Sequence, residues 1–145
     1  MTSDNDHLDE ESTRNNDSLF SFKYTESGGL SNKYLLISYD SATKEIKAST
    51  DMTGSNMAQK TLTDSDEETL RECFKGDRFF GFDADYPAGK DTEKDDSSVL
   101  SFTLIVTIGS KVHTVMWTNK SKEIPDELTQ IKDKIKEIVS SKKMI

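Results

Sequence analysis

The chain has 145 residues, which is enough for one domain of ordinary size. Hydrophobic residues make up only 32% of it and charged residues another 32%, and the net charge of −8 disfavours nonspecific binding to nucleic acid or to an anionic membrane. A single cysteine excludes an internal disulfide and suits a reducing compartment.

The acidic character is concentrated in residues 1–18. This segment has six acidic residues against one arginine, and its only sizeable apolar side chains are Met1 and Leu8. Such a segment cannot bury enough apolar surface to offset the entropy lost on ordering, so we predict a disordered acidic tail. Residues 19–145 are then predicted to form a single, mildly acidic domain.

The chain shows no targeting or membrane signal. Its N-terminus lacks a basic start followed by an apolar stretch, and no run approaches the ~20 apolar residues of a membrane span. We therefore expect a cytoplasmic protein that does not associate with membranes.

Residues 19–25 and 33–39 are predicted to form two strands. In the first, Phe20, Phe22 and Tyr24 alternate with polar residues, which is the period of a half-buried strand. The second is rich in β-prone residues but alternates less clearly.

Between these strands lies the segment Glu26-Ser27-Gly28-Gly29-Leu30-Ser31. Glycines adopt positive φ at little steric cost, so Gly28 and Gly29 predict a sharp bend in the backbone. Leu30 follows at once, where a simple turn typically carries a polar residue. Two interpretations remain open: the bend presents Leu30 to a partner, or it only turns a hairpin while Leu30 covers the core.

Residues 40–62 are mostly polar, and we expect an extended piece near 45–48 followed by a loop near 53–56. A helix is predicted to begin at Thr63 or Asp64, because either can cap it and acidic residues occupy its first turn. The helix buries Leu70, Cys73 and Phe74 at helical spacing.

Aromatic residues then cluster at Phe79, Phe80 and Phe82, too densely for solvent, and predict part of the core. An acidic loop is expected over residues 83–98. The clearest alternation of the chain follows in residues 100–108, and a Gly109-Ser110 turn leads into a return strand over residues 111–118.

A final helix is predicted to open at Ile124-Pro125-Asp126-Glu127, with Pro125 in its first turn, where proline is favoured. Its apolar stripe contains Leu128, Ile131, Ile135, Ile138 and Val139. Two hairpins and two amphipathic helices predict an α+β fold, with a four-stranded antiparallel sheet and both helices packed on one face.

Residues for catalysis or metal binding are scarce. The histidines are His7 in the tail and His113 on a strand, and Cys73 lies on the apolar stripe of a helix. An acidic run beginning at Asp83 has Pro87 and Ala88 where a calcium loop needs a ligand and a glycine. We therefore expect no enzyme, no catalytic residues, no metal and no cofactor.

Several motifs recur in an order typical of a known family. They are Tyr24-Thr25-Glu26-Ser27-Gly28-Gly29-Leu30 with Phe22 upstream, Phe79-Phe80, Phe102-Thr103-Leu104-Ile105-Val106, Lys111-Val112-His113-Thr114-Val115 and Ile124-Pro125-Asp126-Glu127-Leu128. Over residues 19–140 this order resembles the emfourin family, small cytoplasmic inhibitors of protealysin and related thermolysin-like zinc metallopeptidases. The acidic tail, a longer polar stretch after the second strand and Glu26, where a basic residue often stands, depart from the family pattern.

The resemblance implies a proteinaceous inhibitor that is a monomer when free and whose partner is a thermolysin-like metallopeptidase. Its protease-binding residues would be Glu26, Ser27, Gly28, Gly29, Leu30 and Ser31. Such peptidases prefer a bulky apolar side chain after the scissile bond, so Leu30 would occupy that pocket, and Glu26 or the Ser27 hydroxyl would approach the metal.

The alternative is a protein-binding adaptor that uses an exposed sheet face. Its predicted surface lies around His113, Val115 and Trp117 on the last strand.

Overall fold

A computed structural model of the protein describes residues 19–29, 33–51, 53, 55–75, 77–87 and 99–144. The elements in chain order are β1 (Phe20–Gly28), β2 (Lys33–Asp40), β3 (Glu45–Ser49), β4 (Ala58–Thr61), α2 (Asp64–Cys73), α3 (Asp77–Phe80), β5 (Asp85–Tyr86), β6 (Leu100–Ile108), β7 (Lys111–Thr118) and α4 (Asp126–Ser141). The predicted tail, residues 1–18, lies outside the described residues.

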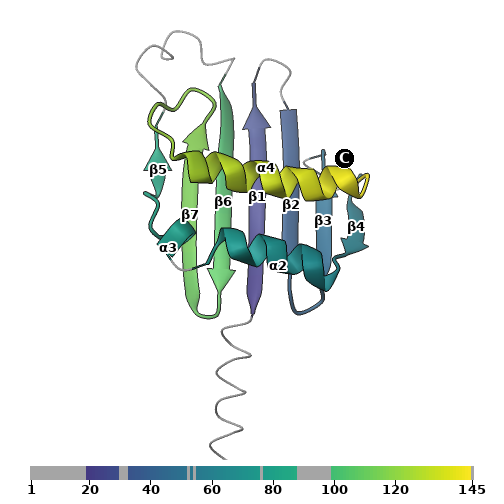
Figure 1. The fold of residues 1–145 in the computed structure, drawn as a ribbon. Helices are drawn as coiled ribbons and strands as arrows, with labels where there is room; N and C mark the ends of the chain where they lie inside the picture. Colours follow the sequence, from purple (N-terminus) through teal and green to yellow (C-terminus); the bar gives the residue numbers. More distant parts are fainter. Residues whose placement is uncertain are drawn as a thin grey trace, which may run out of the picture.

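Within the described part of the chain, seven strands form one sheet in the order β4-β3-β2-β1-β6-β7-β5 (Figure 1). All neighbours are antiparallel except β5 and β7, which are parallel. The predicted four-stranded antiparallel sheet is therefore wrong, although the fold is α+β overall.

The sequence indicates only part of the additional strands. The extended piece expected near residues 45–48 is β3, which the predicted four-stranded sheet did not include. The edge strand β4 has one apolar residue, the half-buried Ala58, so it shows no hydrophobic alternation. The strand β5 has two residues, too few for alternation, and lies inside the stretch predicted as an acidic loop.

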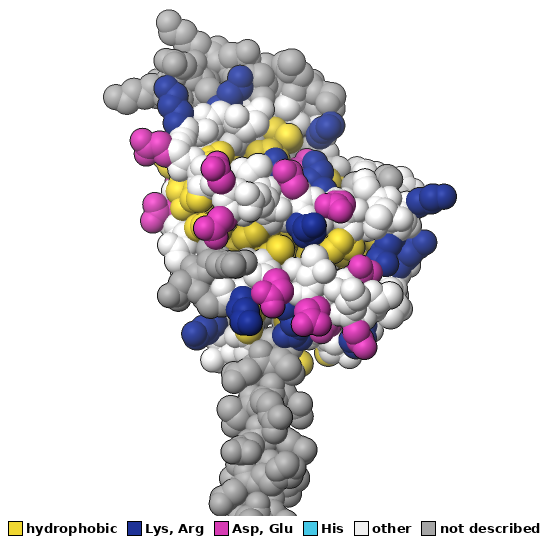
Figure 2. All heavy atoms as spheres, in the orientation of Figure 1, with side chains coloured by type: hydrophobic (Ala, Val, Ile, Leu, Met, Phe, Trp, Pro, Cys, Tyr) yellow, Lys and Arg dark blue, Asp and Glu magenta, His cyan; other side chains and the backbone are white. Residues whose placement is uncertain are grey.

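Helices α2 and α4 both cover the same face of the sheet (Figure 1). The inward side chains of β1 and the apolar stripe predicted for α4 are buried beneath and within this layer. Acidic and basic side chains intermingle on the outer surface of the helices (Figure 2). The predicted start of α2 is confirmed, because the Thr63 hydroxyl accepts a hydrogen bond from the Asp66 amide at 3.1 Å.

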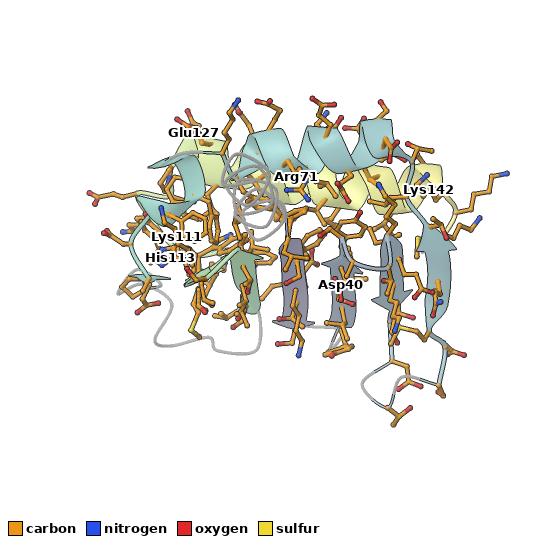
Figure 3. The ribbon with its side chains drawn as sticks, turned by 90° about the horizontal axis from the view of Figure 1, so that it is seen from below. Asp40, Arg71, Lys111, His113, Glu127 and Lys142 are labelled. Carbon is orange, nitrogen blue, oxygen red and sulfur yellow. The ribbon has the colours of Figure 1, made fainter. Side chains whose placement is uncertain are left out.

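The opposite face of the sheet carries no helix (Figure 3). Its side chains are mainly serine and threonine, as expected for an antiparallel sheet with one solvated face. Val112 and Met116 on β7 point to this side and are 61% and 50% exposed. None of the described helices combines the length and the apolar composition of a membrane span.

An ion pair joins the two long helices, with Lys142 Nζ of α4's C-cap 2.8 Å from Asp66 Oδ2 of α2. The hydrogen bond from Lys142 lowers the pKa of Asp66 despite some desolvation. A carboxyl whose pKa is lowered on folding stabilises the folded state above its unfolded pKa, and this contribution is lost as the pH falls through the folded value.

We predict that Asp66→Asn lowers the free energy of unfolding at neutral pH by up to about 1 kcal/mol, the range of partly exposed pairs. The difference from the wild type should shrink below pH 4 and vanish once Asp66 of the wild type is protonated. Urea denaturation at a series of pH values measures it. A difference that stays constant with pH would contradict the assignment.

The register of β6 predicts opposite outcomes for two adjacent substitutions. Leu104 is fully buried under the helices, whereas Ile105 faces the helix-free side. Leu104→Ala should lower the free energy of unfolding by about 2–5 kcal/mol, because it leaves a cavity in the core. Ile105→Ala should cost about 1 kcal/mol or less. Equal or reversed losses in urea denaturation would mean that the strand is displaced by one residue.

Candidate functional site

The candidate site is the diglycine bend, Gly28 and Gly29, at the end of the central strand β1. Both glycines have positive φ, 105° and 80°. Gly28 still pairs with Lys33 of β2 and with Leu100 of β6, so the bend begins where the paired sheet ends. The predicted contact residues Leu30 and Ser31 lie outside the described residues.

Backbone atoms of Val99 hold this bend. The Gly29 amide donates a hydrogen bond to the Val99 carbonyl oxygen at 2.9 Å. A Cβ atom at Gly28 would lie 2.7 Å from that same oxygen, closer than real Cβ atoms approach. Glycine at position 28 is therefore required by sterics as well as by its φ.

Glu26 does not project from the bend. It continues the inward series of β1 and is only 3% exposed. Its Oε2 accepts a hydrogen bond from the Tyr24 hydroxyl at 2.5 Å and lies 2.8 Å from Nζ of Lys136 on α4. We call these three residues the Glu26 cluster. The carboxylate thus has two partners within the protein, whereas the side chain of Ser27, on the other face of β1, is exposed.

The environment of Tyr24 keeps its hydroxyl protonated. Burial, followed by the hydrogen bond to Glu26 and the negative charges of Glu26 and Asp133, raises the pKa of Tyr24 far above its ordinary value. The hydroxyl therefore acts as a permanent donor to the carboxylate.

Aromatic side chains of β6 and β7 pack beside the Glu26 cluster. The ring of Trp117 lies 5.3 Å from that of Phe102 and 6.4 Å from that of Tyr24. Nζ of Lys132, one helical turn before Lys136, lies 4.8 Å above the Phe102 ring. Two lysines of α4 therefore reach the end of the sheet that carries the bend.

Sequence reasoning did not identify Lys136, because a lysine outside the apolar stripe of an amphipathic helix is typical of a solvated face. A signal was present on β1, where Glu26 takes the next inward position after Phe20, Phe22 and Tyr24. A carboxylate at an inward position requires a partner from the covering layer.

The adaptor surface predicted around His113, Val115 and Trp117 is wrong as an exposed surface. These side chains face the helices, and Val115 and Trp117 are 0% and 3% exposed. Nε2 of His113 lies 2.8 Å from the Phe82 carbonyl oxygen, and its ring packs edge-on against Phe79.

A cavity of about 560 Å³ lies at the opposite end of the strands, between α2 and the β6–β7 turn, where acidic and basic side chains both line it. Among the described residues, no three His, Cys, Asp or Glu side chains are grouped to hold a metal ion.

A scan against models of known protein families finds no match to this chain, and a search of curated proteins finds none either. The resemblance to the emfourin family therefore stays a prediction from sequence motifs.

The two glycines of the bend should respond differently to alanine. Gly29→Ala should cost roughly 1–2 kcal/mol of the free energy of unfolding, from the positive φ alone, because the nearest atom to its added Cβ is 3.9 Å away. Gly28→Ala adds the clash with Val99 and should cost more. Urea denaturation of both variants tests this ranking, and a larger loss at Gly29 would contradict the geometry.

Proposed function

We propose that this protein is a non-covalent inhibitor of a thermolysin-like zinc metallopeptidase and that residues 27–30 fill the active-site cleft of the enzyme. The observation that carries the proposal is the diglycine bend, held in positive φ at the end of a strand that is paired along both edges and followed directly by a leucine. The motifs shared with the emfourin family supply the class of partner.

A bend of this kind suits insertion into a narrow cleft. Glycines carry no side chains, so their backbone can approach the walls of a cleft closely. The hydrogen bond from the Gly29 amide to the Val99 carbonyl oxygen restrains the bend before a partner binds. Binding therefore costs less conformational entropy. Leu30 would then supply an apolar side chain worth roughly 1.5–3 kcal/mol on burial.

One of the two groups expected to approach the zinc ion of the peptidase, Glu26 or the Ser27 hydroxyl, is left out of the proposal. Glu26 is buried and paired with Lys136, so we do not include its carboxylate among the groups that approach the zinc ion of the enzyme. The exposed hydroxyl of Ser27 is retained for that part of the proposal.

A second candidate function, a protein-binding adaptor, is favoured by one observation. Val112 and Met116 are the exposed large apolar residues of β7, and Ile105 lies between them on the neighbouring strand β6. This patch is on the helix-free face and differs from the surface predicted by sequence.

Titration of a thermolysin-like peptidase with the purified protein tests the proposal. The wild type should remove activity stoichiometrically. Leu30→Ala should weaken inhibition at least about tenfold, because the lost burial of a leucine corresponds to one to two decades of affinity.

The matched control is the double variant Val112→Ser, Met116→Ser on the helix-free face. It should inhibit as the wild type does. If this control loses inhibition and Leu30→Ala does not, the sheet face is the interface. If the wild type leaves several such peptidases fully active, the inhibitor proposal is wrong.

A further inference from the structure

We infer that Lys136 of α4 is a positioning residue for the diglycine bend and acts through the buried carboxylate of Glu26. Its importance for inhibition rests on the proposed function, whereas its effect on the bend does not. Helix α4 would then help to position the inhibitory bend in addition to covering the sheet.

The first step concerns the carboxylate. The Glu26 side chain is 4% exposed, and an ionised carboxylate at such a site is costly unless it is paired and hydrogen-bonded. Lys136 supplies the charge, and Tyr24 supplies the hydrogen bond. The carboxylate is thereby held by Lys136 on α4 and by Tyr24 on its own strand, β1.

The second step concerns the asymmetry of the pair. The Lys136 side chain is 38% exposed, so its ammonium group keeps water contacts while the carboxylate does not. Loss of Lys136 would leave a buried charge without its counterion, which favours a shift of Glu26 toward solvent. Glu26 lies two residues before the end of β1, so such a shift disturbs the last residue pairs of the strand before the bend.

The third step connects the pair to the bend. Glu26 precedes Gly28 by two residues, and Ser27 and Gly28 are each paired with β2 and β6. Directly after them, the Gly29 amide donates its hydrogen bond to Val99. A displacement of Glu26 is therefore transmitted along this short paired segment and should strain or open the contact at Gly29.

A second lysine of α4, Lys132, connects the helix to β6 in a similar way. Phe102 is the cross-strand partner of Glu26, and Lys132 lies over its ring. Lys132 and Lys136 are four residues apart and so share one face of α4. The helix thus contacts both β1, which ends at the bend, and β6, which begins directly after Val99.

Amide hydrogen exchange tests the inference without any peptidase. The Gly29 amide reports on the bend, and the Gly109 amide, which donates to the Leu19 carbonyl oxygen at 2.9 Å at the other end of β1, serves as the internal reference. Lys136→Met should accelerate exchange at Gly29 at least about tenfold relative to Gly109.

Three further variants separate positioning from general stability. Glu26→Gln combined with Lys136→Met removes both charges, so no unpaired charge drives position 26 toward solvent, and exchange at Gly29 should return close to the wild-type rate. Lys136→Arg should likewise retain protection, since it keeps the charge. Lys134→Met is the matched control, because Lys134 pairs with the exposed Glu137 of the same helix, 3.5 Å away, and not with Glu26. It should leave Gly29 unchanged.

Inhibition assays on the same proteins complete the test. Lys136→Met should weaken inhibition about tenfold and Lys136→Arg should restore it. Equal acceleration at Gly29 and Gly109 in Lys136→Met, or no change at Gly29 in that variant, would overturn the positioning role. A wild type that does not inhibit, combined with selective exchange at Gly29, would overturn the proposed function and leave the positioning role standing.

Discussion

The structure depends on the complete pairing of β1. This strand pairs with β2 from Ser21 to Gly28 and with β6 from Phe20 to Gly28, so both of its edges are occupied along its length. Its inward side chains Phe20, Phe22, Tyr24 and Glu26 are all buried. Because the helices cover one face only, these side chains set the plane on which both helices pack.

The helix layer is attached to that plane by polar contacts as well as by apolar ones. The Tyr39 hydroxyl of β2 donates a hydrogen bond to Glu67 of α2, and Glu67 also pairs with Arg71 at 3.0 Å. At the other end of the strands Lys136 of α4 reaches Glu26. Polar pairs of this kind add little net stability, but they allow few alternative arrangements of a helix on a sheet. In our proposal, the direction of the bend at Gly28 and Gly29 depends on this arrangement of helix and sheet.

The two faces of the sheet therefore have different roles. On the helix side of the described sheet, aromatic rings and the Glu26 cluster pack beneath α4 near the bend. On the other side, β1, β6 and β7 carry mainly serine and threonine residues, interrupted by Ile105, Val112 and Met116. The inhibitor proposal uses the end of β1, and the adaptor proposal uses this apolar patch.

The sequence by itself determined the long elements. Alternation predicted β6 and the first part of β1, which continues to Gly28 beyond the predicted end at residue 25. The Gly109-Ser110 turn predicted the return strand β7, helical spacing predicted α2 and α4, and the diglycine predicted a bend with positive φ at Gly28 and Gly29. These features depend on local backbone preferences and on which side chains avoid water, and both are visible in a short window of residues.

Only the tertiary structure decided the width of the sheet and the partners of its polar side chains. Strand β5 has two residues and β4 has a single half-buried apolar residue, so neither carries a periodic signal. The extended piece expected near residues 45–48 joins the sheet as β3 through hydrogen bonds with β2 and β4. The pairing of Glu26 with Lys136 joins residues far apart in the chain, so no local pattern contains it. The burial of Val115 and Trp117 likewise depends on which face of the sheet the helices cover, and alternation alone is symmetric between the two faces.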